Sequence, residues 1–269
     1  MFYGLKCYLT NIFKVRSFYL YMKKEKKSIF LSKRYPLYLF IITIVLFGIT
    51  AINPPYPQDF FYEHIMTVVF LIVVAFSYKK FRLSNLSYTF IFLFLVLHII
   101  GARFTYSEVP YNEFFIKYFG FDLNNFFGFG RNHYDRLVHF SFGLFFAYPI
   151  RELFWRIANA RGIWRYYLPL DVIMAFSMIY EIIEFGFAVI VGGDVSHTYL
   201  GTQGDIWDAQ KDMLLATFGG FITLTITFLI NLRYKGLKAV VKDSFKVHRK
   251  KPLGEVELLR MMKKSTPQN

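Results

Sequence analysis

The sequence contains a single cysteine, Cys7, among its 269 residues. One thiol excludes a disulfide bond within the chain and any zinc site built from several cysteines. The chain also lacks an internal repeat, a phosphate-binding P-loop, a dinucleotide-binding glycine fingerprint and a serine nucleophile elbow. The sequence therefore carries none of the signatures by which nucleotide-binding proteins and serine hydrolases are recognised.

Negative charge is scarce as well, with 18 acidic residues against 32 basic ones. Apolar residues are abundant instead: they make up 55% of the chain, and aromatic residues alone make up 21%. This composition is far from that of an ordinary soluble domain, so it predicts an integral membrane protein. We expect a multi-pass protein of the cell membrane, with membrane lipid as its surroundings.

Six apolar runs are long enough to cross ~30 Å of hydrocarbon, which takes about 20 helical residues. They lie at residues 36–53, 59–78, 85–102, 135–157, 168–191 and 206–232. The first run is expected to be a retained span, because it is too long for a signal peptide and lacks a small-x-small cleavage site. The predicted fold is all-α, a polytopic membrane helix bundle of about six transmembrane helices over residues 36–232. Residues 1–35 form a basic N-terminal extension and residues 233–269 a basic tail.

The distribution of lysine and arginine predicts the orientation. With the N-terminus inside, 27 of the 32 basic residues fall in the extension, the tail or the inner loops. Basic residues are retained on the cytoplasmic side of short loops, so we expect both termini in the cytoplasm. Topology thus explains the positive charge, and no nucleic-acid partner is expected.

Acidic residues show the opposite distribution. Twelve of the 18, among them Asp59 and Glu63, lie in the predicted outer loops or toward the outer ends of spans. Charged side chains in hydrocarbon cost at least ~2.5 to 3.5 kcal/mol, so such residues normally face a protein interior and serve a function there. Six of these twelve, in or beside the last three spans, are the candidate site residues: Asp135, Glu181, Glu184, Asp205, Asp208 and Asp212.

Helical spacing groups these acids by face. Asp135 lies four residues before His139, Glu181 lies three before Glu184, and the three later aspartates follow a spacing of i, i+3 and i+7. Residues at these spacings share one face of a helix. Their depths below the outer surface overlap, so the sequence predicts one polar pocket in the outer half of the bundle.

Carboxylates crowded together in a low dielectric must be protonated or neutralised by cations. Carboxylates with a histidine favour a divalent metal, Zn, Mg, Mn or Ca. The predicted metal ligands are Asp135, His139, Glu184, Asp205, Asp208 and Asp212. In the predicted catalytic scheme Glu181 accepts a proton, and Arg103 or Arg136 pairs with a phosphate group.

Structural alternatives exist for individual residues. Asp205 could instead be the N-cap of the sixth helix, a position that favours short acids. His98 in the third span could be a hydrogen-bonded core histidine. For Glu181 and Glu184 a functional role is favoured, because two acids one turn apart within a span are costly to retain.

Four segments carry a resemblance to a known family: LHIIGARFTYSEVPY, RNHYDRLVHFSFG, YEIIEF and YLGTQGDIWDAQKDM. Over about residues 36–232 the chain resembles the uncharacterised bacterial inner-membrane family typified by YjdF. The resemblance implies no established activity. Besides the site residues above, it highlights His98, Tyr106, Tyr134 and Gln203. It implies a histidine at the position occupied here by Arg103. If that histidine is a metal ligand in the family, this chain has a counter-ion in place of the ligand.

The leading functional hypothesis is a membrane-embedded, metal-dependent enzyme acting on a lipid or lipid-linked substrate. A transporter that uses the same acids as a proton or cation relay is the alternative. The lack of repeats and the one-sided acids argue against it, because alternating access favours a site near the midplane. A non-catalytic membrane factor is the third possibility, although one or two polar pairs suffice for helix packing. The sequence defines no oligomeric state.

Overall fold

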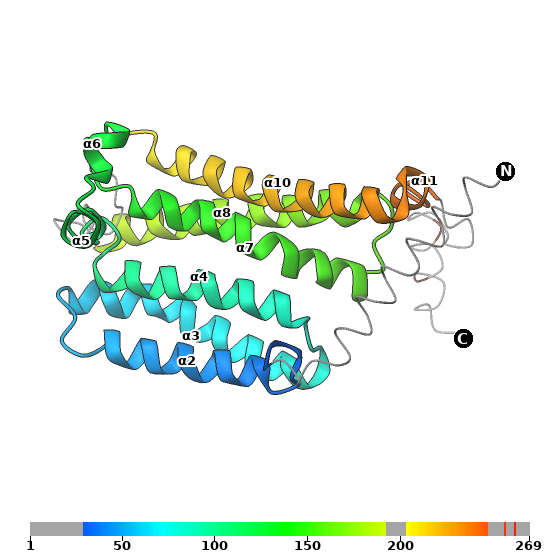
Figure 1. The fold of residues 1–269 in the computed structure, drawn as a ribbon, viewed down its shortest axis with the longest axis horizontal. Coiled ribbons are helices and arrows are strands. Elements are labelled where there is room, and N and C mark those ends of the chain that lie inside the picture. The colour runs from blue at the N-terminus through cyan, green and yellow to red at the C-terminus, as the bar shows by residue number, and fades with distance from the viewer. Residues whose placement is uncertain (1–28, 192–202, 247–255, 257–260, 262–269) are drawn as a thin grey trace, which may run out of the picture.

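The computed structural model describes residues 29–191 and 203–246, together with Val256 and Met261. Within these residues the chain is helical and contains no strand. The short elements are η1 (Ile29–Leu31), α5 (Tyr111–Phe119), α6 (Leu123–Phe127) and α11 (Leu237–Val240). The long helices are α2 (Tyr35–Thr50), α3 (Pro57–Lys80), α4 (Asn85–Arg103), α7 (Tyr134–Arg156), α8 (Trp164–Val191) and α10 (Asp208–Lys235). The long helices lie along one common axis (Figure 1).

Each predicted span coincides with one long helix, and the predicted ends are within four residues of the observed ones. Four of these helices, α3, α4, α8 and α10, are long and apolar enough to cross a membrane. Helix α2 is apolar but shorter, with 16 residues. Helix α7 is less apolar, because charged side chains occupy its first turn and its last two turns. The all-helical membrane fold is thereby confirmed in its coarse form.

Small residues bring α7 and α10 into close contact along their length. A Cβ atom on Gly143 of α7 would overlap the backbone of Ala216 on α10. A Cβ atom on Gly219 of α10 would likewise overlap the backbone of Phe140. Thr223 then donates a hydrogen bond of 2.6 Å to the carbonyl of Leu144 across the same interface. Helices in membranes approach closely where small side chains allow backbone contact, so this pair forms the centre of the bundle.

The remaining long helices surround this pair. Helix α8 packs on both α7 and α10, and α4 packs on α7 from the other side. Helices α2 and α3 pack on α4 and form the outer layer, as Figure 1 shows. Ile173 of α8 is fully buried in a core with Ala147 and Ala216.

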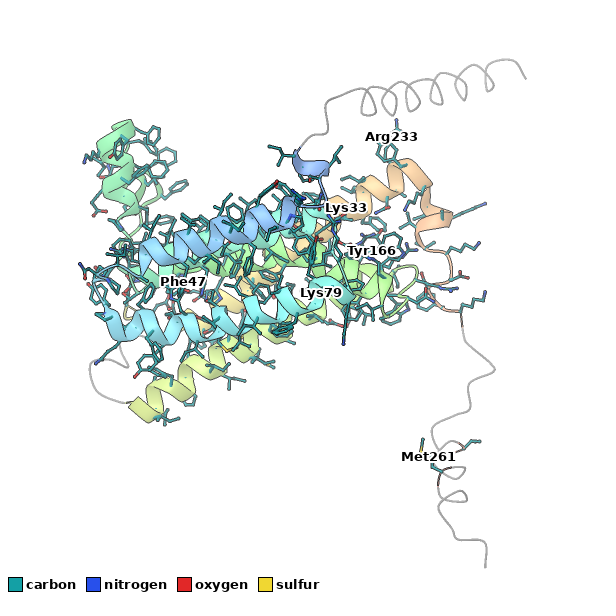
Figure 2. The ribbon with its side chains drawn as sticks, turned by 90° about the horizontal axis from the view of Figure 1, so that it is seen from below. Lys33, Phe47, Lys79, Tyr166, Arg233 and Met261 are labelled. Carbon is teal, nitrogen blue, oxygen red and sulfur yellow. The ribbon has the colours of Figure 1, made fainter. Side chains whose placement is uncertain are left out.

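The two ends of the bundle differ in chemistry. Lys33, Lys79 and Arg233 lie at one end, which we call the basic end (Figure 2). Helices α5 and α6 lie at the opposite end and run across the bundle axis. Their phenylalanines are exposed, including Phe119 and Phe126 at 67% each. Aromatic side chains of this kind suit the membrane interface. Asp135 of α7, Glu181 and Glu184 of α8, and Asp208 and Asp212 of α10 also lie toward this second end, which we call the acidic end.

Candidate functional site

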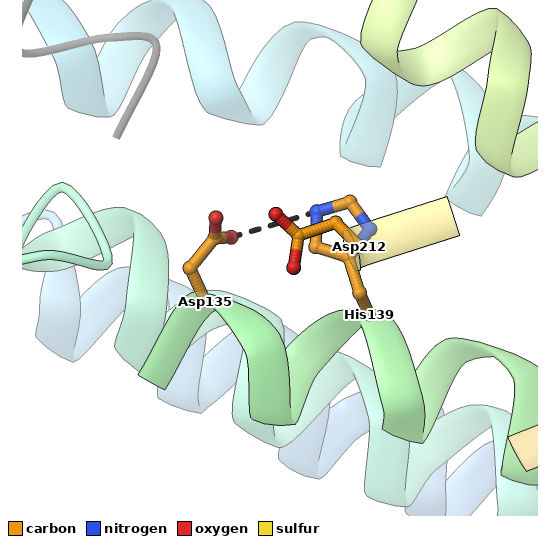
Figure 3. Close-up of side chains that lie close together, drawn as sticks. All are labelled: Asp135, His139 and Asp212. Atoms are coloured by element: carbon orange, nitrogen blue, oxygen red, sulfur yellow. Dashed lines mark ion pairs between the residues drawn. The ribbon is translucent and has the colours of Figure 1, made fainter. Parts of the chain in front are cut away.

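Three side chains from α7 and α10 meet near the acidic end (Figure 3). Asp135 and His139 lie one turn apart on α7, and Asp212 faces them from α10. One potential ligand atom from each of the three lies within 4.8 Å of the other two. The His139 Nε2 atom is 3.6 Å from the Asp135 Oδ1 atom. We call these three residues the carboxylate–histidine triad.

Two carboxylate oxygens of this region are buried without a hydrogen-bond partner. Asp212 is 2% exposed, and its Oδ1 atom has no partner among the described residues. The Glu181 Oε1 atom of α8 also lacks a hydrogen bond and lies 3.7 Å from the Nδ1 atom of His139. A buried acceptor left unsatisfied costs about 1–3 kcal/mol, and more when it is charged. Such oxygens indicate that a proton or a cation completes the site.

Arginine side chains neutralise the next acids toward the acidic end. Asp208, at the start of α10, pairs with both Arg131 and Arg136. Arg136 also pairs with Asp205, whose other partner, Lys211, is 2.6 Å away. The hydrogen bond from Lys211 is the main cause that lowers the pKa of Asp205 to about 2. These residues form an ion-pair rim over the triad. Asp205 and Asp208 therefore contact cationic side chains rather than the triad.

Asp205 does not cap the sixth helix. Helix α10 begins at Asp208, its N-cap is Trp207, and no side chain makes a cap hydrogen bond there. Asp205 instead accepts a hydrogen bond of 3.1 Å from the backbone N–H of Trp207. The N-cap alternative for Asp205 is thus wrong, because the helix begins two residues later than that alternative requires.

Glu184 lies one turn nearer the acidic end of α8 than Glu181 and is buried. The carboxylates of Asp135, Glu181, Glu63 and Asp212 are all close enough to act on it electrostatically. The predicted convergence of acids from several helices therefore includes Glu184. Within the described residues its carboxylate is not among the three ligand groups that come within 4.8 Å of one another.

Glu63 of α3 is a site residue that the sequence analysis did not select. It is 6% exposed and accepts a hydrogen bond of 3.1 Å from the Tyr180 hydroxyl of α8. Its sequence signal was present: Glu63 lies six residues inside an apolar helix, where an acid is costly. Asp59 lies four residues earlier on the same helix, so the spacing signal was present as well, but the sequence analysis grouped only the acids of the last three spans.

Arg103 contacts a different part of the molecule. Its guanidinium donates hydrogen bonds to the carbonyl oxygens of Thr50, Ile52 and Asn53 at the end of α2. A cation there satisfies carbonyls that the helix leaves unpaired and complements the helix dipole. The structure therefore places Arg103 at the end of α2, whereas Arg136 lies beside the acids.

His98 is engaged through both ring nitrogens. Its Nδ1 atom is 2.6 Å from the Tyr106 hydroxyl, and its Nε2 atom is 2.5 Å from the Thr67 hydroxyl. Tyr106 reaches it through a turn in which Thr105 and Tyr106 both adopt positive φ, at 51° and 56°. Gly101 leaves room for the Tyr106 ring, which a Cβ atom would meet at 2.5 Å. His98 is therefore a hydrogen-bonded interior histidine.

Two other highlighted residues hold backbone segments in place. The Gln203 amide makes two hydrogen bonds of 3.1 Å with the backbone of Asn132. The Tyr134 hydroxyl donates to the carbonyl of Leu97 at 3.0 Å. Both contacts position the start of α7, and with it Asp135. The preceding part of the loop, residues 192–202, lies outside the described residues.

Comparison with known proteins places this arrangement in a family. The model of DUF2238, a family of predicted membrane proteins, matches residues 35–233. The chain belongs to this family. Inner membrane protein YjdF of Escherichia coli (strain K12) is 35% identical over 175 residues, which cover 65% of this chain and 77% of the relative. No solved structure matches the chain. The predicted resemblance, the multi-pass character and the inner-membrane location are confirmed.

Proposed function

We propose that this DUF2238 protein is a membrane-embedded, metal-dependent enzyme acting on a lipid or lipid-linked substrate. The observation that carries the proposal is the carboxylate–histidine triad, whose three ligand atoms lie within 4.8 Å of one another. An acidic cluster alone is weak evidence. Here the buried, unpartnered Oδ1 atom of Asp212 is a second observation that points to a bound cation.

The triad has suitable chemistry for a divalent metal. Zinc takes carboxylate and imidazole ligands at about 2.0–2.2 Å, so neighbouring ligand atoms around one ion are separated by roughly 3–4.5 Å. The His139–Asp135 separation of 3.6 Å falls in that range. When Nε2 serves as the ligand, Nδ1 faces the carboxylate of Glu181. Two carboxylates with one imidazole also suit manganese.

Neighbouring side chains have roles in this proposal. A divalent metal supplies an activated water and a positive charge opposite a phosphate. Glu181, beside His139, accepts the proton from the attacking water. Arg136 pairs with the substrate phosphate, and its position beside Asp208 supports this choice over Arg103. Asp208 holds Arg136 at the rim until substrate binds.

We further infer that six helices cross the membrane, with both termini in the cytoplasm and the triad toward the outer face. The six long helices alternate in direction between the basic and acidic ends, which supports an even number of crossings. The clustering of Lys33, Lys79 and Arg233 at one end supports assigning that end to the cytoplasm.

Metal analysis of the detergent-purified protein tests the proposal. We expect about one divalent ion per chain, as in other three-ligand catalytic sites, and its loss in Asp212→Asn and His139→Gln. The matched control is Asp122→Asn, an exposed acid at the same end that caps the short helix α6. Metal-free wild-type protein under metal-replete conditions contradicts the proposal, as does full metal content in both triad variants.

Turnover is measured separately. Wild-type protein in mixed micelles with total bacterial lipid extract should change the lipid profile seen by mass spectrometry, and EDTA should stop the change. Glu181→Gln should keep its metal and lose turnover, because it removes the proton acceptor. Metal binding without any lipid conversion would favour the alternative function below.

A proton- or ion-coupled transporter is favoured by a different observation. The Glu63 carboxylate accepts a hydrogen bond from Tyr180. Thr67, one turn further along α3, is hydrogen-bonded to His98, and His98 is hydrogen-bonded to Tyr106. Thr67 is ten residues into α3, or about 15 Å, which is near the midplane of a ~30 Å hydrocarbon layer. This buried polar chain thus extends from the acidic site to the depth that alternating access requires. Tyr106→Phe removes the hydroxyl that contacts His98. If the protein is a transporter, this variant should lose pH-driven uptake into proteoliposomes. If the protein is an enzyme, the variant should keep its lipid turnover.

A further inference from the structure

A separate feature lies between α2, α3 and α4 toward the basic end. An apolar cavity of about 230 Å³ lies there, partly open at its surface, and its lining is almost entirely hydrocarbon. Leu39 of α2, Val74 of α3 and Leu95 of α4 represent the three helices that form its wall. The volume is below the ~300–1,000 Å³ typical of pockets for drug-sized ligands, which suits a single hydrocarbon chain.

Helices α2 and α3 contact each other above and below this cavity. Nearer the acidic end the Phe47 ring of α2 is 4.8 Å from the His64 ring of α3 and 6.0 Å from that of Phe60. At the basic end the Tyr78 hydroxyl of α3 donates a hydrogen bond of 3.1 Å to the carbonyl of Lys33, just before α2. Between these contacts the side chains of the two helices leave the apolar cavity.

Four basic residues adjoin the lining residues Pro36 and Tyr78 in sequence, at the edge of the cavity nearest the basic end, which we call its mouth. Lys33 and Arg34 precede α2, and Lys79 and Lys80 end α3. All four are exposed, and none forms an ion pair with a described acid. Lys33 and Lys79 lie at the same end of the molecule in Figure 2. The Tyr78–Lys33 hydrogen bond joins the two basic segments directly.

We propose that this cavity binds one chain of an anionic glycerophospholipid, with the lipid phosphate held by the basic residues at its mouth. The apolar wall supplies the surface for a hydrocarbon chain, and four exposed cations without a described acidic partner supply charge complementarity. Basic pockets between membrane helices at the cytoplasmic surface are known to hold anionic headgroups. The bound lipid fills the space between α2 and α3 and holds both helices against α4.

This site is independent of the proposed catalysis. It lies toward the basic end, whereas the carboxylate–histidine triad lies toward the acidic end, and the two share no residue. Failure of the lipid proposal leaves the triad untouched, and failure of the metal proposal leaves the lipid site untouched.

Thermal unfolding of the purified full chain in detergent tests the lipid site. The probes are dioleoyl phosphatidylglycerol, which is anionic, and dioleoyl phosphatidylcholine, which is zwitterionic with the same chains. A ligand that binds the folded state raises the midpoint of unfolding. We expect phosphatidylglycerol to raise it at lower concentration than phosphatidylcholine. Equal effects of the two lipids would overturn the proposal.

Two variants with matched controls locate the effect. Val74→Phe fills the cavity and should abolish the phosphatidylglycerol shift. Its control, Val73→Phe, makes the same change at the neighbouring position, which is 56% exposed and outside the cavity lining, and should keep the shift.

Lys33→Gln combined with Lys79→Gln should raise the half-maximal lipid concentration by roughly tenfold or more, because each basic residue near the surface adds attraction for anionic lipid. Lys235→Gln combined with Lys238→Gln, two other basic residues, is the charge control and should change little.

A full phosphatidylglycerol shift in Val74→Phe overturns the cavity assignment. An unchanged half-maximal concentration in the double lysine variant overturns the headgroup assignment. Should Val74→Phe fail to give monodisperse protein, Ala75→Leu makes a smaller filling of the same wall. Native mass spectrometry then compares retained phosphatidylglycerol in wild type and variant, and equal retention overturns the proposal.

Discussion

Gly143 of α7 lies directly against the carbonyl group of Ala216 on α10, so close that a methyl group on Gly143 would overlap it. His139 and Asp212 each lie one helical turn before this contact, on the same two helices. Because α7 and α10 both run from the acidic end to the basic end, the glycine contact sets the spacing of the two site residues. The backbone approach and the triad are therefore one structural unit.

The first prediction concerns this contact. Gly143→Ala must push α7 and α10 apart, and overpacking of a tight interface costs about 1–3 kcal/mol. The same shift separates His139 from Asp212, so the bound metal should decrease as well. Gly48→Ala on α2 is the control, since a Cβ atom there meets nothing within 4 Å. Thermal unfolding and metal content are measured for both variants. A Gly143→Ala protein with wild-type stability and full metal content would show that the contact does not position the site.

A second prediction separates structural from functional acids. Glu152 of α7, near the basic end, accepts hydrogen bonds from the Ser84 N–H at 2.9 Å, the Ser87 hydroxyl at 2.6 Å and Arg156 at 2.7 Å. Hydrogen bonds to charged groups contribute about 1.5–3 kcal/mol each, so Glu152→Gln should lower stability by about that much. Metal content should not change.

Asp212→Asn should behave in the opposite way. Without metal, the Asp212 carboxylate is buried beside other acids and its Oδ1 atom has no partner. Removing that charge should leave the stability of the EDTA-treated protein unchanged or higher, because an uncompensated buried charge is the costly term. Unfolding midpoints of both variants in EDTA provide the test. Equal destabilisation by the two substitutions would mean that Asp212 is a structural acid like Glu152.

The helices and the convergence of acids on one end were predictable from the sequence, because both depend on local patterns. The length of each apolar run predicts a membrane span. The spacing of residues along a helix predicts that Asp135 shares a face with His139, and Glu181 with Glu184. The partners of each acid were not predictable. The sequence does not show whether Asp208 binds a metal or an arginine. In the structure it pairs with Arg131, from the segment before α7, and with Arg136, from the first turn of α7.

Two other features depend on long-range packing. Arg103 was a candidate phosphate-binding residue from its sequence position, yet its guanidinium meets carbonyls more than 50 residues earlier in the chain. The sequence analysis counted Glu63 only as one acid near the outer end of a span. The structure shows its hydrogen bond with Tyr180, which belongs to a helix that is distant in sequence. Helical periodicity holds no information about which helix lies next to which, so these pairings required the structure.

Topology is the third prediction. In a Cys7→Ser background, Gly130→Cys places a thiol at the exposed acidic end, and Lys80→Cys places one at the basic end. A membrane-impermeant maleimide should label Gly130→Cys in intact cells and Lys80→Cys only after lysis, because basic residues remain in the cytoplasm. The opposite labelling pattern would show that the triad lies on the cytoplasmic side, and it would contradict the proposal of an outward-facing site.

The fourth prediction concerns pH and the ion-pair rim. Lys211, at 2.6 Å, is the main cause that lowers the pKa of Asp205 from 3.8 to about 2 in the folded protein. A lowered pKa means that the unfolded chain binds the proton first as pH falls, so the carboxylate stabilises the fold above pH 3.8 and this contribution is lost by about pH 2. The difference in unfolding midpoint between wild type and Asp205→Asn should therefore be constant above about pH 5 and shrink between pH 4 and 2.

Lys211→Gln should reduce the difference at high pH and move its loss to higher pH, because it removes the main stabilising partner of the carboxylate. Circular dichroism of the detergent-solubilised protein from pH 6 to 2 provides the measurement. A difference that stays constant over this range, or grows as the pH falls, would mean that Asp205 is not held by the rim in the folded protein.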